Sequence, residues 1–526
     1  MKKRVIATIL CMLLAAEGLT NLSGGNSVYA AEKTDKSNLK RVIITTDLEC
    51  DDMNSLIHLS LFFNDVDLDG IVLTSSQFHF SGDGGQHTLA QINSDYACED
   101  ASAATLTSYR PAPENWINQL WQNEYAASYR YLVQNDPDYP TPDELSKITK
   151  IGNIEFEGDV RYDTEGSNQI KAAILDNDER KLYLMNWGGF NTVARALLSI
   201  ADDYKNTAQW EEIRQKIYNK VIISGYGQDN TYKDYIVSLY PDLKLMDVSD
   251  GYAGYFTAKN AQENVRYTFQ SAWLKKNIKF DHGSLMNKYG LMDDGTVYEG
   301  EPAANQYGLT KKIDWGFMKA DFDQYDFLAE GDSSGFMALI PVGLAGLSNR
   351  FCDTLAGSVS YVEPDFRSMA EKMTQTSTNA VYNNYNAVTG ENSDSTEKYL
   401  LAYQQEWAAR ADWCVKGYDY CNHAPVINVS ASNLVVTPGE VIKLAATVTD
   451  PDNDSCSAYW NIDPYKGSYS GDSKNLTVWD PVELNTAFTV PKDAKSGDTF
   501  VITLTVKDHA DAPMTRYAQL VATVKQ

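Results

Sequence analysis

The strongest constraint on the fold is residues 41–56, where a buried strand is followed by three aspartates and then by a helix. Residues 42–44 are Val-Ile-Ile, and such a short β-branched apolar run predicts a strand with both faces buried. Apolar residues then recur at helical spacing, at Met53, Leu56, Ile57 and Leu61. The acids Asp47, Asp51 and Asp52 therefore lie where the strand ends, which is where open α/β sheets bind ligands.

Three aspartates within six positions repel one another unless a positive charge lies between them. Ca²⁺ accepts such a set of oxygen ligands, so the spacing indicates a cation site. An alternative is that Asp51 and Asp52 only cap the helix, where negative charge is favourable. Asp47, placed directly at the strand end, favours the cation site.

Further apolar strands alternate with helical segments along the first two thirds of the chain, and this predicts a doubly wound, mostly parallel sheet. The expected strands are residues 70–76, 181–187 and 220–225. From residue 425 the pattern changes to short alternating strands separated by turns, which predicts an all-β sandwich of immunoglobulin-like type.

Two features of the expected sandwich bear on function. Asp450, Asp452 and Asp454 either bind a structural Ca²⁺ or only form a turn, and their spacing fits both. Trp460 lies on an expected strand and is predicted to be core, whereas Tyr459, Tyr465 and Tyr469 are candidates for stacking on sugar rings.

Residues 1–30 read as a secretory signal peptide, with a basic start, an apolar run at 5–16 and a small-residue cleavage pattern at 28–30. We therefore expect a secreted protein without a membrane anchor. The formal net charge of −26 argues against a nucleic-acid partner, since phosphate contacts need basic patches. No close Cys-x-x-Cys pair is present, so zinc is not expected.

The motif at residues 45–56 resembles the N-terminal signature of nucleoside hydrolases. It is more similar to a secreted bacterial family that joins a nucleoside-hydrolase-like domain to a C-terminal domain of the cellulose-binding-protein type. Further blocks carry this resemblance: Asp163-x-Glu-Gly-Ser, Trp187-Gly-Gly, Tyr226-x-Gln-Asp229, His282-Gly-Ser-Leu285 and Glu330-Gly-Asp332.

The patterns and the resemblance together predict four segments. These are a signal peptide at 1–30, a nucleoside-hydrolase-like α/β domain at 39–345, a helical and loop connection at 346–422, and the sandwich at 423–526, a candidate carbohydrate-binding domain. Within the connection, residues 397–415 are expected to be helical.

The resemblance implies a Ca²⁺ site and a hydrolytic mechanism. The implied metal ligands are Asp47, Asp52, the carbonyl of Trp187, and Asp332. Asp47 would act as general base on a water held by the ion, and the water would attack an anomeric carbon. The expected substrate contacts are Asp51, Gln77, Asn191, Gln228 and Asp229.

Several departures bear on the substrate. Gly331 stands where many nucleoside hydrolases have a histidine acid, Ser76-Gln77 replaces Gly-Asn, and Thr45 replaces an aspartate. We therefore expect a secreted Ca²⁺-dependent hydrolase of N- or O-glycosyl bonds, acting on a carbohydrate or glycoside rather than an ordinary nucleoside. Candidate replacement acids are His79, His87 and His282.

Two alternatives stand beside the hydrolase. One is a non-catalytic protein that binds a cellulose-like polysaccharide on a hydrolase-like scaffold, which the missing histidine favours. The other takes Asp47 and Glu49 as the acids of a phosphatase. It is weaker because it leaves the blocks at Trp187 and Glu330 unexplained.

Overall fold

A seven-stranded sheet forms the centre of the N-terminal part of the chain. The computed structural model describes residues 36–93, 103–225, 231–248, 253–316, 319–362, 385–386, 391–392, 397–430 and 433–525. The predicted signal peptide lies outside these residues. The strands follow the order β3-β2-β1-β4-β5-β6-β9, and every pair is parallel except β6 with β9. Their bounds are β1 (Arg41–Thr46), β2 (Asp67–Leu73), β3 (Thr149–Ile151), β4 (Leu182–Trp187), β5 (Val221–Gly225), β6 (Lys244–Val248) and β9 (Val359–Val362).

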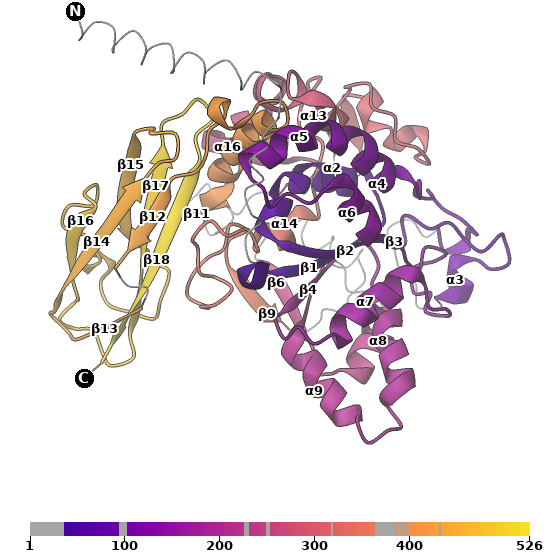
Figure 1. The fold of residues 1–526 in the computed structure, drawn as a ribbon, viewed down its shortest axis with the longest axis horizontal. Helices are drawn as coiled ribbons and strands as arrows, with labels where there is room; N and C mark the ends of the chain where they lie inside the picture. Colours follow the sequence, from indigo (N-terminus) through magenta and orange to yellow (C-terminus); the bar gives the residue numbers. More distant parts are fainter. Residues whose placement is uncertain are drawn as a thin grey trace, which may run out of the picture. The chain divides into compact units, whose positions relative to one another are not determined.

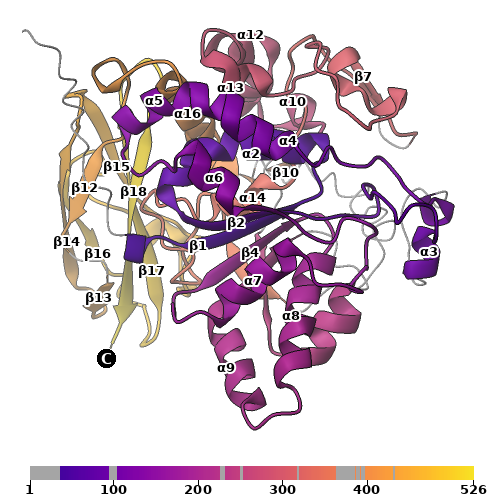
Figure 2. The same ribbon diagram turned by 45° about the vertical axis from the view of Figure 1, so that its right-hand side comes forward.

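Helices cover both faces of this sheet, which confirms the predicted doubly wound α/β fold (Figures 1 and 2). One face packs on α7 (Glu165–Leu175), α8 (Asn191–Tyr204) and α9 (Trp210–Lys220). Among the helices on the other side are α2 (Cys50–Leu59), α13 (Gly283–Lys288) and α14 (Ser333–Met337). The other α-helices of the described residues are α3 (Leu89–Ile92), α4 (Trp116–Gln119), α5 (Ala126–Asn135), α6 (Pro142–Ile148), α10 (Thr257–Asn260), α11 (Glu263–Arg266), α12 (Ser271–Leu274) and α16 (Glu397–Trp413). No helix among the described residues is long and apolar enough to cross a membrane.

The C-terminal part is the predicted β-sandwich. A three-stranded sheet has the order β12-β14-β16, and a four-stranded sheet has the order β13-β18-β17-β15. Their core contains Trp460, only 1% exposed, as predicted. The strands are β12 (Val426–Val429), β13 (Asn433–Val436), β14 (Val441–Thr449), β15 (Cys456–Ile462), β16 (Asn485–Thr489), β17 (Thr499–Asp508) and β18 (Thr515–Val524). Two short hairpins, β7 (Lys312–Asp314) with β8 (Lys319–Asp321) and β10 (Tyr385–Asn386) with β11 (Glu391–Asn392), complete the strands described.

The connecting helix α16 is packed into the α/β core rather than lying between separate domains. Its Arg410 is 2% exposed and donates to the Leu61 carbonyl at 2.7 Å and to Asp65 at 2.7 Å. Its Glu406 accepts from Arg516 of β18 at 2.8 Å. The helix α16 therefore bonds both to the α/β part, at Leu61 and Asp65, and to β18 of the sandwich, at Arg516.

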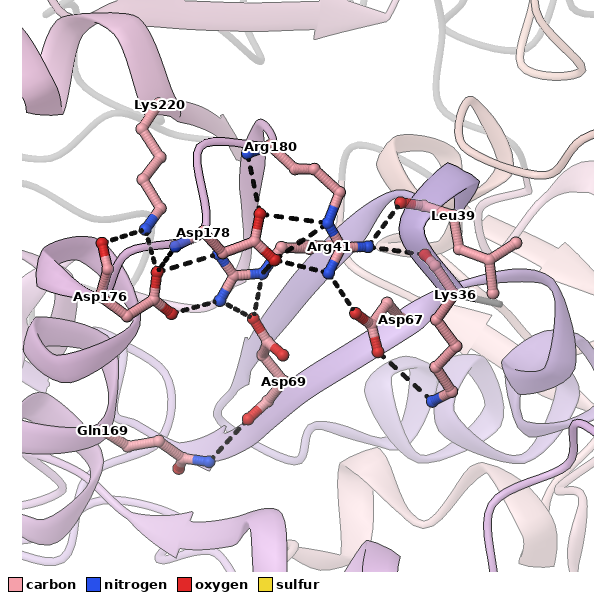
Figure 3. Close-up of polar contacts among 10 residues, drawn as sticks. All are labelled: Lys36, Leu39, Arg41, Asp67, Asp69, Gln169, Asp176, Asp178, Arg180 and Lys220. Carbon is pink, nitrogen blue, oxygen red and sulfur yellow. Dashed lines mark hydrogen bonds and ion pairs between the residues drawn. The ribbon is translucent and has the colours of Figure 1, made fainter. Parts of the chain in front are cut away.

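A network of paired charges closes the amino-terminal edge of the sheet (Figure 3). Arg41, which begins β1, is 4% exposed and donates to Asp69 at 2.8 Å and to Asp176 at 2.7 Å. Arg180 donates to Asp67 at 2.7 Å and also to Asp178. Each buried charge at this edge has an opposite partner, as burial requires.

We expect Arg41→Met to lower the free energy of unfolding by about 2 kcal/mol, because Asp69 and Asp176 would lose a shared buried partner. The matched control is Lys319→Met, which breaks an ion pair to Asp314 whose side chains are both more than half exposed, and it should cost less than about 1 kcal/mol. Urea unfolding measures both. Equal losses would contradict a structural role for the network.

Candidate functional site

The predicted acid cluster lies at the carboxyl edge of the sheet, where the strand order reverses. β1 pairs with β2 on one side and with β4 on the other, so Thr46 is level with both Leu73 and Trp187. Asp47 follows Thr46 directly and is only 3% exposed. The site thus occupies the crevice in which doubly wound folds bind ligands.

A tight turn joins β1 to α2 and fixes the orientation of the acids. Leu48 has a left-handed backbone, with φ of 59°, and its N–H donates to the Thr46 hydroxyl at 3.1 Å. That hydroxyl donates in turn to Asp52 Oδ1 at 2.5 Å. The Glu49 N–H donates to Asp47 Oδ1 at 3.3 Å. Asp47 and Asp52 are therefore held by bonds within six residues of chain.

Asp332 comes from far along the chain and completes the cluster. It precedes α14, and carboxylate oxygens of Asp51, Asp52 and Asp332 all lie within 4.8 Å of one another. Trp187 ends β4 beside Asp47, and a Cβ on Gly188 would lie 3.0 Å from the Asp47 Cβ. The structure thus brings together all four predicted metal-ligating residues, with Asp51 as a fifth neighbour.

Burial and mutual proximity make ionisation of these acids costly. Burial, followed by the charge of Glu49, raises the pKa of Asp47 to about 7. Burial and neighbouring carboxylates also raise the pKa values of Asp51, Asp52 and Asp332 well above their usual range. Close buried carboxylates remain ionised only when a cation compensates them.

The donor set fits a hard cation such as Ca²⁺. Asp51 Oδ1 is buried and has no hydrogen-bond partner among the described residues. A buried acceptor in that state needs a ligand to compensate it. Carboxylate and carbonyl oxygens are the ligands that Ca²⁺ takes. The residues that would hold it are Asp47, Asp52 and Asp332, and Trp187, whose carbonyl is the fourth expected ligand, ends β4 level with Thr46.

A second buried network holds the segment that carries Asp332. Glu330 is 0% exposed and accepts hydrogen bonds from Ser333 at 2.8 Å and from the Tyr289 hydroxyl. His58 Nδ1 lies 2.9 Å from Glu330 Oε1, and its ring stacks on Trp407 of α16 with centroids 4.1 Å apart. The connecting helix therefore supports the acid cluster through His58 and Glu330.

The other predicted substrate contacts differ in where the structure places them. Gln77 follows the β2 strand end and is partly buried. Asn191 is fully buried and donates to the Asn153 carbonyl at 2.7 Å, so it holds two loops together. Gln228 and Asp229 lie outside the described residues. Contacts of these four residues with a substrate remain predictions.

The three candidate histidine acids do not gain support. His79 is near the cluster, but burial lowers its pKa to about 4 and its Nδ1 faces the Arg110 carbonyl at 2.8 Å. His87 pairs with Asp83 at 2.6 Å, and His282 contacts Asp412 of α16 at 3.2 Å. A Cβ on Gly331 would lie 2.7 Å from Asp51 Oδ2, so a histidine at that position would press on Asp51.

Sequence reasoning did not predict an ion-paired group beside Asp47. Arg110 Nη2 donates to Glu49 at 3.0 Å and to Glu301 at 2.7 Å. Arg110 and Glu301 stand 61 and 252 positions from Glu49, so no spacing could have linked them. The one sequence feature that could have pointed to this group is the position of Glu49 inside the motif at residues 45–56.

We expect Tyr289→Phe to lower the free energy of unfolding by about 2 kcal/mol, because Glu330 would lose a donor to a buried carboxylate. The matched control is Tyr240→Phe, which removes a buried hydroxyl that donates to the neutral Leu197 carbonyl at 2.8 Å and should cost about 1 kcal/mol. Chemical denaturation compares them. A smaller loss for Tyr289→Phe than for Tyr240→Phe would contradict the network.

Comparisons with solved structures agree with this geometry. A nucleoside hydrolase-related hypothetical protein from Saccharophagus degradans, described as associated with carbohydrate metabolism, matches with a TM-score of 0.63 and 22% identity over 93% of this chain and all of the other. This similarity supports the fold. An endo-β-1,4-mannanase from Thermotoga petrophila aligns over 94% of this chain and 99% of its own at 7% identity, with a TM-score of only 0.16.

Comparisons with families match both parts of the chain. No curated protein matches it. Residues 441–524 match the family described as cellulose-binding protein Sde0182, C-terminal domain. Residues 41–358, more than half of the chain, match the family described as cellulose-binding Sde182, nucleoside hydrolase-like domain. The chain therefore belongs to the cellulose-binding Sde182 family with a nucleoside hydrolase-like domain, as the sequence motifs predicted.

Proposed function

We propose that this protein is a Ca²⁺-dependent hydrolase of glycosidic bonds whose substrate is a carbohydrate or glycoside. The observation that carries the proposal is the group of Asp51, Asp52 and Asp332, whose oxygens lie within 4.8 Å at the carboxyl edge of the sheet. The buried, unpartnered Oδ1 of Asp51 supports it, because the residues described there supply no positive charge to that atom.

The chemistry follows from what each side chain is placed to do. A bound Ca²⁺ would supply an oriented water of lowered pKa. Asp47 would accept a proton at its carboxylate as the water attacks the anomeric carbon, and the leaving group would depart with the bonding electron pair and take up a proton from solvent. Asp51 faces the glycosyl unit, and its negative charge stabilises the positive charge that develops there. Asp52 and Asp332 would hold the ion.

The place of action proposed is outside the cell. It rests on the basic start, the apolar run and the small-residue pattern of residues 1–30.

Calcium titration tests the metal site. Asp52→Asn keeps the size of the side chain and removes its charge, so we expect it to weaken Ca²⁺ binding by on the order of 100-fold or more. The matched control is Asp450→Asn in the sandwich, where Asp450, Asp452 and Asp454 also lie within 4.8 Å. Calorimetry on the full chain compares the two with the wild type.

Asp450→Asn should leave the Ca²⁺ affinity of the acid cluster at Asp52 unchanged, because Asp450 lies in the sandwich and not at that cluster. Unchanged binding in Asp52→Asn would refute the metal site and with it the hydrolase. Release of 4-nitrophenol from a panel of chromogenic glycosides, lost in Asp47→Asn, is the result expected of the enzyme.

A second candidate function is binding of a cellulose-like polysaccharide by the sandwich, since both matched families carry that description. Trp479 supports it. Its side chain is 59% exposed, and its indole N–H donates to Thr489 of β16 at 3.2 Å, which fixes the ring at the surface. An exposed, fixed aromatic ring is suited to stacking on a sugar.

We expect Trp479→Ala to weaken adsorption to insoluble cellulose by about tenfold or more, because a central aromatic contact dominates such interfaces. The control is Tyr162→Ala, which removes a similarly exposed aromatic residue from the α/β part. Depletion of protein from solution by microcrystalline cellulose gives the affinities. Equal adsorption by both variants and the wild type would exclude Trp479 as the contact.

A further inference from the structure

A second group of charges lies directly beside the acid cluster. Arg110 lies between two carboxylates, donating to Glu301 from Nε and Nη2 at 2.7 Å each and to Glu49 from Nη2 at 3.0 Å. His79 Nε2 lies 3.2 Å from Glu301. Glu49 is two residues from both Asp47 and Asp51, so this group, called the wall below, adjoins the acid cluster.

Glu49 is the member of this group that faces outward. Its side chain is 24% exposed, whereas those of Glu301 and Arg110 are 4% and 7% exposed. Arg110 and the Tyr255 hydroxyl, at 3.5 Å, both donate to Glu49 Oε1. Glu49 Oε2 lies 4.0 Å from His79 Nε2, too far for a hydrogen bond, so it can accept one from a ligand.

Neither cationic side chain of this group, Arg110 or His79, is available to pair with an anionic ligand. The guanidinium of Arg110 is already bound to both carboxylates, and these contacts raise its pKa. His79 is buried and faces Glu301. Two carboxylates, Glu49 and Glu301, share the single guanidinium of Arg110, so one negative charge of the group stays uncompensated. A phosphate, sulfate or carboxylate on the ligand would therefore meet net negative charge.

Aromatic side chains continue the wall. The Tyr255 ring contacts Trp315 with centroids 5.0 Å apart and Tyr307 with centroids 5.4 Å apart. Tyr255 and Trp315 are partly exposed. Aromatic faces suit the C–H faces of a sugar ring, and a carboxylate suits its hydroxyl groups.

We propose that Glu49 is a substrate-binding residue that accepts hydrogen bonds from hydroxyl groups of the glycosyl unit, and that this wall selects uncharged glycosyl units over anionic ones. Arg110 and Glu301 are positioning residues that hold Glu49 in place. The inference rests on the proposed hydrolase function and names the class of its substrate.

Matched neutral and anionic probes test this selectivity. Methyl β-D-riboside and methyl β-D-glucoside are each compared with the uronate in which a carboxylate replaces the terminal CH₂OH group. Dissociation constants are measured by saturation-transfer NMR on the full chain in saturating calcium. The wild type should bind at least one neutral glycoside about tenfold more tightly than its uronate.

Glu49→Gln should raise the dissociation constant of the neutral glycoside about tenfold, because a charged hydrogen-bond acceptor is lost. It should also reduce the difference in affinity between the neutral glycoside and its uronate, because Arg110 loses one of its two carboxylate partners. Glu49→Asp keeps the charge but shortens the side chain, so it should weaken neutral binding yet keep the preference for it. Glu49→Asp also provides the test of Glu49 if Glu49→Gln fails to fold. Glu211→Gln, on an exposed position of α9, is the matched control and should behave as the wild type.

Three results would overturn the inference: a uronate bound as tightly as its neutral partner, unchanged neutral binding in both Glu49 variants, or no binding of either neutral glycoside. Calcium titration of the same samples separates these outcomes from failure of the proposed function. Normal Ca²⁺ binding would leave the metal site standing while the assignment of Glu49 falls.

Discussion

Mutual repulsion among buried carboxylates is the constraint on which the rest of this structure depends. Asp51, Asp52 and Asp332 bring oxygens within 4.8 Å of one another, and Asp47 adjoins them at the end of β1. Burial alone disfavours each charge, and the negative charges of neighbouring carboxylates add to that cost. Such an arrangement persists only because the surrounding framework holds the acids in place, and this is typical of functional sites.

The two edges of the sheet show the contrast directly. At the amino-terminal edge, Asp67, Asp69 and Asp176 each pair with a lysine or arginine, and these pairs fasten the loops (Figure 3). At the carboxyl edge the site acids have no such ion pair with a lysine or arginine of the described residues, and Arg110 is bound to Glu49 and Glu301 instead. Aspartate therefore stabilises the amino-terminal edge of the sheet through ion pairs, whereas at the carboxyl edge it forms a candidate binding site.

Local sequence was enough to predict part of the site. The fold class is confirmed because buried strands and helices alternate regularly, and Asp47 and Asp52 were recognisable because strand, turn and helix are contiguous. Asp332 was found only through the family block around it, since 280 positions separate it from Asp52. His58, Arg110 and Glu301 were not assigned to the site, because each meets its partner through tertiary packing that no spacing encodes.

The most direct test of the account is a crystal structure of the full chain grown with saturating calcium, with diffraction recorded at a wavelength where calcium scatters anomalously. The account predicts an anomalous peak at the carboxyl edge of β1, within coordination distance of Asp52 and Asp332. No peak there, or a peak confined to Asp450, Asp452 and Asp454, would contradict the claim that the buried carboxylates form a calcium site.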